Sequence, residues 1–181
     1  MHSRTNLDRS TGCGDSPRRW RECALAKRVF ILHNLMMRVG DRLVADLDLT
    51  SSRWLLLGAV ADRPEPPTMS ELSNDAVLSL QNVSRMVAAM EAVGLLERVP
   101  TPGGGRAVRV RLTEKGRELH EATKERGCRF ATGFLEGIGG AEVERLEIDL
   151  DRLIDNLERL ETQLMTRRAE TPAAQDLESE A

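Results

Sequence analysis

The sequence predicts a mainly α-helical fold with a small β-hairpin wing: a winged helix-turn-helix flanked by N-terminal and C-terminal dimerisation helices. Three observations predict it. Residues 68–92 hold two short helix patterns joined by a tight turn, residues 95–112 alternate as two strands around a Gly-rich tip, and long helices with heptad spacing lie on both sides. We therefore expect a flexible tail over 1–17, a dimerisation helix over 18–48, the winged helix-turn-helix over 49–113, a linker helix and C-terminal dimerisation helix over 114–168, and a disordered acidic tail over 169–181.

The first helix is predicted from about Pro17 to Val44. Its apolar residues are separated by alternating steps of four and three, the spacing of a helix that packs along another helix: Leu25, Val29, Leu32, Met36, Val39 and Leu43. A second, buried helix begins after Thr50, which can cap it, and ends before Pro64.

The two helices of the helix-turn-helix follow. Thr68 and Glu71 have the spacing of a reciprocal capping box for the first, and Ser79 can cap the second. Apolar residues then recur at helical spacing on one face of the second helix, at Val83, Met86, Val87 and Met90. The opposite face is short and mostly polar, and it is suited to a DNA groove: Leu80, Gln81, Asn82, Ser84, Arg85 and Ala88.

Gly94 is expected to end this helix in the left-handed conformation, and the hairpin begins at Leu95 and Leu96. In the second strand Val108, Val110 and Leu112 alternate with Ala107, Arg109 and Arg111, which predicts one buried and one basic face.

Thr113 can cap a further helix that runs to about Gly133. The last helix has the most regular pattern in the chain, with steps of three and four between Val143, Leu146, Leu150, Leu153, Leu157, Leu160 and Leu164. One small core cannot easily cover so long a seam. We therefore favour pairing of the first and last helices with a second copy of the chain over an intramolecular bundle.

Charge is segregated along the chain. The 181 residues carry a net charge of −3, but residues 79–117 hold 7 Lys/Arg against 3 Asp/Glu, and residues 134–181 hold 5 against 13. The positive charge therefore gathers on the one module that would approach phosphates.

Several classes of function are disfavoured. The three cysteines, Cys13, Cys23 and Cys128, lack zinc-ligand spacing and support neither a metal site nor a disulfide framework. No membrane span, secretory signal or phosphate-binding glycine loop is present, so we expect a cytoplasmic protein with no cofactor that is not an enzyme.

With this order of elements, residues 20–166 resemble the MarR family of bacterial winged-helix regulators. The resemblance is carried by Leu49-Thr50 with Trp54, by residues 68–72 and 79–85, by residues 94–98, and by Arg106 followed by residues 108–116. It implies a homodimer that binds a pseudo-palindromic operator in double-stranded DNA and, most often, represses transcription until a small ligand releases it.

The resemblance also implies which residues meet DNA. It places recognition-helix residues in the major groove, Arg106 at the wing tip and three strand arginines at phosphates: Ser79, Gln81, Asn82, Ser84 and Arg85 in the helix, then Arg98, Arg109 and Arg111. Each also has an ordinary structural reading, as a helix cap or as a solvated surface residue. The wing departs from the family pattern, because Gly104-Gly105-Arg106 stands where the family has Asp-x-Arg.

The sequence says less about the effector or oxidant to which such a regulator would respond. A pocket for a small aromatic or phenolic effector would use His33, Met37, Arg53 and Trp54, and an oxidant-sensing repressor would use Cys23. Packing residues and a buried cysteine are the alternatives. A different class of function, a degenerate winged helix that binds only other proteins, also stays open.

Overall fold

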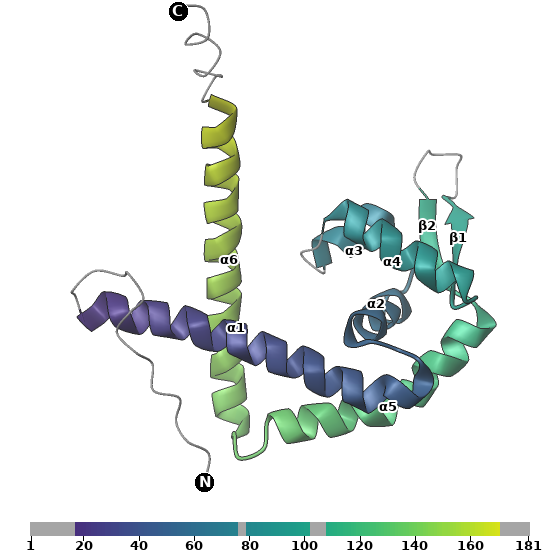
Figure 1. Cartoon of the computed structure of the whole chain (residues 1–181), viewed down its shortest axis with the longest axis horizontal. Helices are drawn as coiled ribbons and strands as arrows, with labels where there is room; N and C mark the ends of the chain where they lie inside the picture. Colours follow the sequence, from purple (N-terminus) through teal and green to yellow (C-terminus); the bar gives the residue numbers. More distant parts are fainter. Residues whose placement is uncertain (1–16, 76–78, 102–107, 171–181) are drawn as a thin grey trace, which may run out of the picture. The chain divides into compact units, whose positions relative to one another are not determined.

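The predicted fold is confirmed by the structure, a computed structural model that describes residues 17–75, 79–101 and 108–170. It divides into two compact units, Met1–Ala131 and Thr132–Ala181. Figure 1 shows the elements in chain order, which are α1 (Pro17–Val44), the short 3-10 helix η1 (Ala45–Leu47), α2 (Ser51–Ala61), α3 (Met69–Asp75), α4 (Leu80–Ala92), β1 (Leu96–Pro100), β2 (Val108–Leu112), α5 (Glu114–Phe134) and α6 (Gly140–Glu170). The tails expected at the two ends lie almost wholly outside the described residues.

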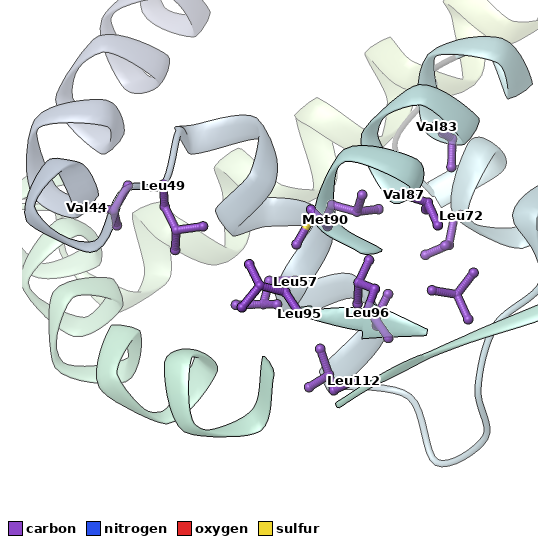
Figure 2. Packing of buried hydrophobic residues seen from close by; sticks show 13 residues of the cluster. Val44, Leu49, Leu57, Leu72, Val83, Val87, Met90, Leu95, Leu96 and Leu112 are labelled. Atoms are coloured by element: carbon purple, nitrogen blue, oxygen red, sulfur yellow. The ribbon is translucent and has the colours of Figure 1, made fainter. Parts of the chain in front are cut away.

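The core of the first unit lies between α2, α3, α4 and the hairpin (Figure 2). Leu57, Val83, Val87, Met90 and Val110 have no exposed surface, so the inward face predicted for α4 is confirmed at three of its four positions. Met86, the fourth, is partly buried against the same cluster. Val108 differs from the alternation, because it is 40% exposed and the buried face of β2 begins only at Val110.

The predicted caps are present. Thr68 and Glu71 form the reciprocal pair: the Thr68 N–H donates to Glu71 Oε2 at 2.6 Å, and the Glu71 N–H donates to Thr68 Oγ1 at 3.2 Å. The first of these bonds lowers the pKa of the Glu71 carboxyl. Ser79 Oγ accepts from the Asn82 N–H at 3.3 Å, and Thr50 Oγ1 accepts from the Arg53 N–H at 3.4 Å.

Gly94 turns the chain from α4 into the hairpin with a φ of 72°. Its N–H donates to the Glu91 carbonyl and the Leu95 N–H donates to the Met90 carbonyl, each at 2.9 Å, which is the Schellman pattern. The strands then pair antiparallel, with Leu96 opposite Leu112 and Glu97 opposite Arg111.

The start of α5 is held against this turn. Thr113 Oγ1 donates to the Gly94 carbonyl at 2.6 Å and accepts from the Gly116 N–H at 3.0 Å, so it caps α5 as expected. Gly116 is buried, and a Cβ added there would lie 2.1 Å from the Leu95 carbonyl oxygen. The helix therefore packs on backbone at a position that only glycine fits.

Replacing Gly116 with alanine should destabilise the fold by about 1–3 kcal/mol, because the clash is with backbone and α5 must shift. Gly133→Ala is the matched control, since Gly133 is also in α5 and a Cβ there meets no atom within 4 Å. It should stabilise by up to about 1 kcal/mol through helix propensity alone. Urea denaturation compares the two, and equal effects would contradict the close packing of Gly116.

A buried serine joins α1 to α2. Ser51 is 4% exposed; its N–H donates to Asp41 Oδ1 at 2.6 Å and its hydroxyl donates to the Met37 carbonyl at 2.5 Å. The bond from the Ser51 N–H is the main cause that lowers the pKa of Asp41. α2 is therefore fixed to the last turns of α1 by polar bonds as well as by packing.

A second joint ties α5 to the end of α1. The Arg126 guanidinium donates to both carboxylate oxygens of Asp46, with the Nη2–Oδ2 distance at 2.8 Å, and also to the Leu43 carbonyl at 2.6 Å. This bidentate pair lowers the pKa of Asp46.

Acid should weaken the fold through these carboxyls. Asp41, Asp46 and Glu71 all have lowered pKa values in the folded chain. Their stabilising effect is therefore complete above the pKa values of the unfolded chain, which are about 4, and is lost as the pH falls through the pKa values of the folded chain. Chemical denaturation between about pH 6 and pH 3 measures this loss. Asp46→Asn should flatten the curve, and a curve as steep as that of the wild type would contradict the contribution of the Asp46–Arg126 pair.

Both long terminal helices expose apolar side chains. Within the second unit, six members of the predicted seam of α6 are 39–65% exposed, from Leu146 to Leu164, and Ile148, Ile154 and Met165 are exposed outside it. In the first unit, α1 exposes Leu25, Val29, Leu32 and Val39 of its predicted seam, and also Phe30, Ile31 and Leu35. The apolar surface of each helix is therefore wider than a single heptad seam. Among the described residues no helix is long and apolar enough to cross a membrane.

Candidate nucleic-acid interface

The outer face of α4 is the centre of the candidate site. Gln81, Ser84 and Arg85 are exposed, Asn82 is half-buried, and Ser79 caps the helix at its N-terminal end. Gln81, Ser84 and Arg85 therefore lie on the side of the helix away from its buried residues. Asn82 lies at the edge of that side, and Ser79 stands at the end of the helix. The N-terminal half of α4 therefore presents hydrogen-bond donors and acceptors to solvent.

Arg85 is paired with a neutral partner. Its Nη2 donates to Asn82 Oδ1 at 2.6 Å, one turn earlier on the same helix. Glu91, an acidic residue further along the same helix, pairs elsewhere: its Oε2 lies 3.4 Å from Arg98 Nη1. Because an amide does not neutralise a guanidinium, Arg85 keeps its full charge while its side chain is oriented along the helix.

The three strand arginines are each near a carboxylate. Arg98 pairs with Glu91, Arg111 Nε donates to Glu97 Oε1 at 2.8 Å across the hairpin, and Arg109 Nη1 lies 3.6 Å from Glu65 Oε2. Phosphate contacts by these arginines stay a prediction, and any such contact would compete with these pairs. Arg106 lies outside the described residues.

Leu80 is a candidate that sequence reasoning placed on the outer face but did not include in the site. It is 51% exposed at the first position of α4. An exposed apolar side chain there can contact a thymine methyl group. The sequence feature that could have identified Leu80 as a site residue is its apolar side chain on an otherwise polar helix face.

The four residues predicted for an effector pocket lie in different surroundings. His33 is exposed on α1, Met37 is half-buried, and Trp54 packs edge-to-face on Phe130 with ring centroids 6.5 Å apart. Arg53 lines a pocket of about 580 Å³. Its other walls come from the end of η1 and the connection to α2, from the turn after α4 and from the first turns of α5: Leu47, Asp48, Leu49, Val93, Leu95, Lys115, Glu118, Leu119 and Ala122.

The cysteines differ from one another. Cys23 is half-buried and disulfide-bonded, whereas Cys128 is a free, exposed thiol. The cysteine spacing did not support a disulfide framework, and it gave no sign of the bond at Cys23, because a disulfide depends on the distance between two Cα atoms in space and not on a spacing motif. In the part of the chain that the structure describes, no three His, Cys, Asp or Glu side chains are placed to hold a metal ion.

Comparisons with known proteins agree with the fold. A family profile described as the MarR family matches residues 47–107. The chain is 32% identical over 129 residues to the HTH-type transcriptional repressor IacR of Pseudomonas putida, covering 71% of this chain and 77% of the relative. It is 28% identical over 139 residues to the transcriptional activatory protein BadR of Rhodopseudomonas palustris, covering 74% and 78%.

Among solved structures, a mutant of MarR from E. coli complexed with operator DNA has the same fold. The TM-score is 0.66 at 22% identity, and the match covers 74% of this chain and 95% of that one.

The fold and the exposed polar face of α4 define a winged helix-turn-helix protein of the transcription-regulating class. The chain belongs to the MarR family, a family of transcriptional regulators. The resemblance inferred from the sequence motifs is thereby confirmed.

Proposed function

We propose that this protein is a cytoplasmic, homodimeric repressor without enzymatic activity, which binds a pseudo-palindromic operator and is released by a small ligand. The observation that carries the proposal is the α4 face, on which an oriented and un-neutralised Arg85 stands beside exposed Gln81 and Ser84. Arg pairs best with guanine, and Gln or Asn with adenine, in the major groove.

A second copy of the chain is the partner that the exposed apolar residues favour. A monomer in water would leave the α6 leucines and the α1 residues Leu25 to Val39 solvated, at a cost of roughly 25 cal/mol for each Å² that a partner could cover. A two-fold dimer would present two α4 helices to half-sites about one helical turn, ~34 Å, apart.

The pocket beside Arg53 supports a ligand that reports to the DNA-binding module. The side chains of Leu47, Leu119 and Ala122 give it apolar walls, and Arg53 and Lys115 provide cations. Its lining includes Val93 and Leu95, which flank the Gly94 turn between α4 and β1. A small apolar molecule with an acidic group fits this lining, and its binding would act on the turn that orients α4.

Repression is supported by the name of the Pseudomonas putida relative, whereas the Rhodopseudomonas palustris relative is named an activatory protein. A reporter gene placed behind the operator distinguishes repression from activation of transcription. Expression that rises on deletion of the regulator supports repression.

The direct test titrates the purified protein into labelled DNA from upstream of its own coding region. Fluorescence anisotropy is recorded with scrambled competitor DNA and at two salt concentrations. Saturable binding that survives competitor, weakens with salt and fits two chains for each site is the expected result. Failure there, and in a selection over random DNA with a folded dimer, would favour the protein-interaction module.

A further inference from the structure

We infer that Arg109 is a positioning residue, which fixes the wing against the helix-turn-helix and does not bind DNA phosphate. The inference rests on the proposed DNA-binding function for its consequence, but its structural part concerns the protein alone. The inference gives Arg109 a different role from Arg111, the other arginine of β2.

The side chain of Arg109 is directed into the protein. It is 23% exposed, its Nη1 donates to the Pro66 carbonyl at 2.6 Å, and the same nitrogen lies 3.6 Å from Glu65 Oε2. Its Nε is buried and has no hydrogen-bond partner within the described part of the chain. A guanidinium that binds phosphate must offer its donors to solvent, whereas this one directs Nη1 to the connection between α2 and α3 and buries Nε.

Backbone contacts join the same two segments. Arg109 forms an isolated antiparallel bridge with Thr68, and the Val110 N–H donates to the Pro67 carbonyl at 2.8 Å. Residues 65–68 therefore run along β2 on the side away from β1. Thr68 is also the cap of α3, so β2 is connected directly to the start of the helix-turn-helix.

Arg111 shows that this arrangement is not a general property of the strand. It lies two residues later, on the same face by strand parity, but its side chain is 55% exposed and pairs across the hairpin with Glu97. Arg111→Gln therefore removes the same charge from the same face and leaves the Pro66 contact in place.

The connection matters for DNA binding because the wing and α4 must reach the DNA in one fixed geometry. If the Arg109 bond is lost, the hairpin samples more orientations, and ordering it on DNA costs conformational entropy. Specific affinity should fall without any loss of a phosphate contact.

The first experiment needs no DNA. Hydrogen exchange of the Val110 amide is measured in the full-length protein and in the Arg109→Gln and Arg111→Gln variants. Exchange should be at least about tenfold faster in Arg109→Gln and close to the wild-type rate in Arg111→Gln, because only the first loosens the segment that holds this amide. Unchanged exchange in Arg109→Gln would overturn the inference, whatever the protein binds.

The second experiment measures DNA affinity against salt concentration. Arg109→Gln should lower specific affinity about tenfold with an unchanged slope of log K against log[salt], whereas loss of a phosphate contact makes the slope shallower by about 0.9. A shallower slope in Arg109→Gln would overturn the inference.

A third experiment uses Glu65→Gln, because the two possible roles of Arg109, phosphate binding and positioning, predict different changes in DNA affinity for this variant. Glu65 is 81% exposed, so the variant should fold, and Glu121→Gln removes an equal charge from an exposed pair with Lys124 on α5. If Arg109 bound phosphate, Glu65→Gln would release it and bind DNA more tightly than Glu121→Gln. Equal or weaker binding supports positioning.

A wild-type protein that binds no DNA would instead refute the proposed function, and the exchange experiment would still decide the role of Arg109.

Discussion

Arg85→Glu is expected to abolish specific DNA binding and leave the dimer intact. Arg85 is exposed on α4, and its Nη2 bond to Asn82 orients a full positive charge along the face proposed for the groove. A glutamate there loses a base contact worth about 1–3 kcal/mol in each half-site and adds repulsion from phosphates, so affinity should fall at least about 100-fold.

Arg129→Glu is the control for this change, since Arg129 is an exposed arginine on α5 and the net charge changes equally. It should lower affinity only by a general electrostatic effect that disappears at higher salt. Anisotropy titrations with specific and scrambled DNA compare the two variants. Retained sequence preference in Arg85→Glu would remove Arg85 from the site.

Leu153→Glu combined with Leu157→Glu should convert the protein to a monomer. Both leucines belong to the α6 seam and are 39% and 65% exposed in the single chain. Two carboxylates buried in a self-associating seam would each lose solvation worth several kcal/mol, so the dimer should dissociate at least about 100-fold more readily.

Thr162→Glu is the matched control, because Thr162 lies on the opposite side of the same heptad pattern and is exposed. Sedimentation of all variants, with circular dichroism to check helix content, gives the result. A dimer that persists in the double variant would place the interface outside the α6 seam.

Features that depend on residues close in sequence were predicted well. The capping pair of Thr68 and Glu71, the left-handed Gly94 and the inward face of α4 follow from hydrogen bonds and periodicities that span at most a few residues. The family resemblance also rests on such local motifs, which is why it could be stated from the sequence.

The partners of charged side chains were not predictable in the same way. Sequence reasoning placed Arg109 and Arg111 together on one basic face. The structure gives them different partners, because Arg109 donates to the Pro66 carbonyl and Arg111 donates to Glu97. These partners are 43 and 14 residues away. Which of them a given arginine reaches depends on strand register and on how the α2–α3 connection packs.

The sequence by itself determined the order and ends of the helices, the hairpin, the core-facing residues and the family. Local hydrogen bonding and hydrophobic periodicity are sufficient for these. Only the tertiary structure decided that Asn82 orients Arg85, that Arg53 lines a pocket together with residues of α5, and that Cys23 forms a disulfide. Pockets and disulfides bring together groups that are distant along the chain, and long-range packing alone sets the distances between them.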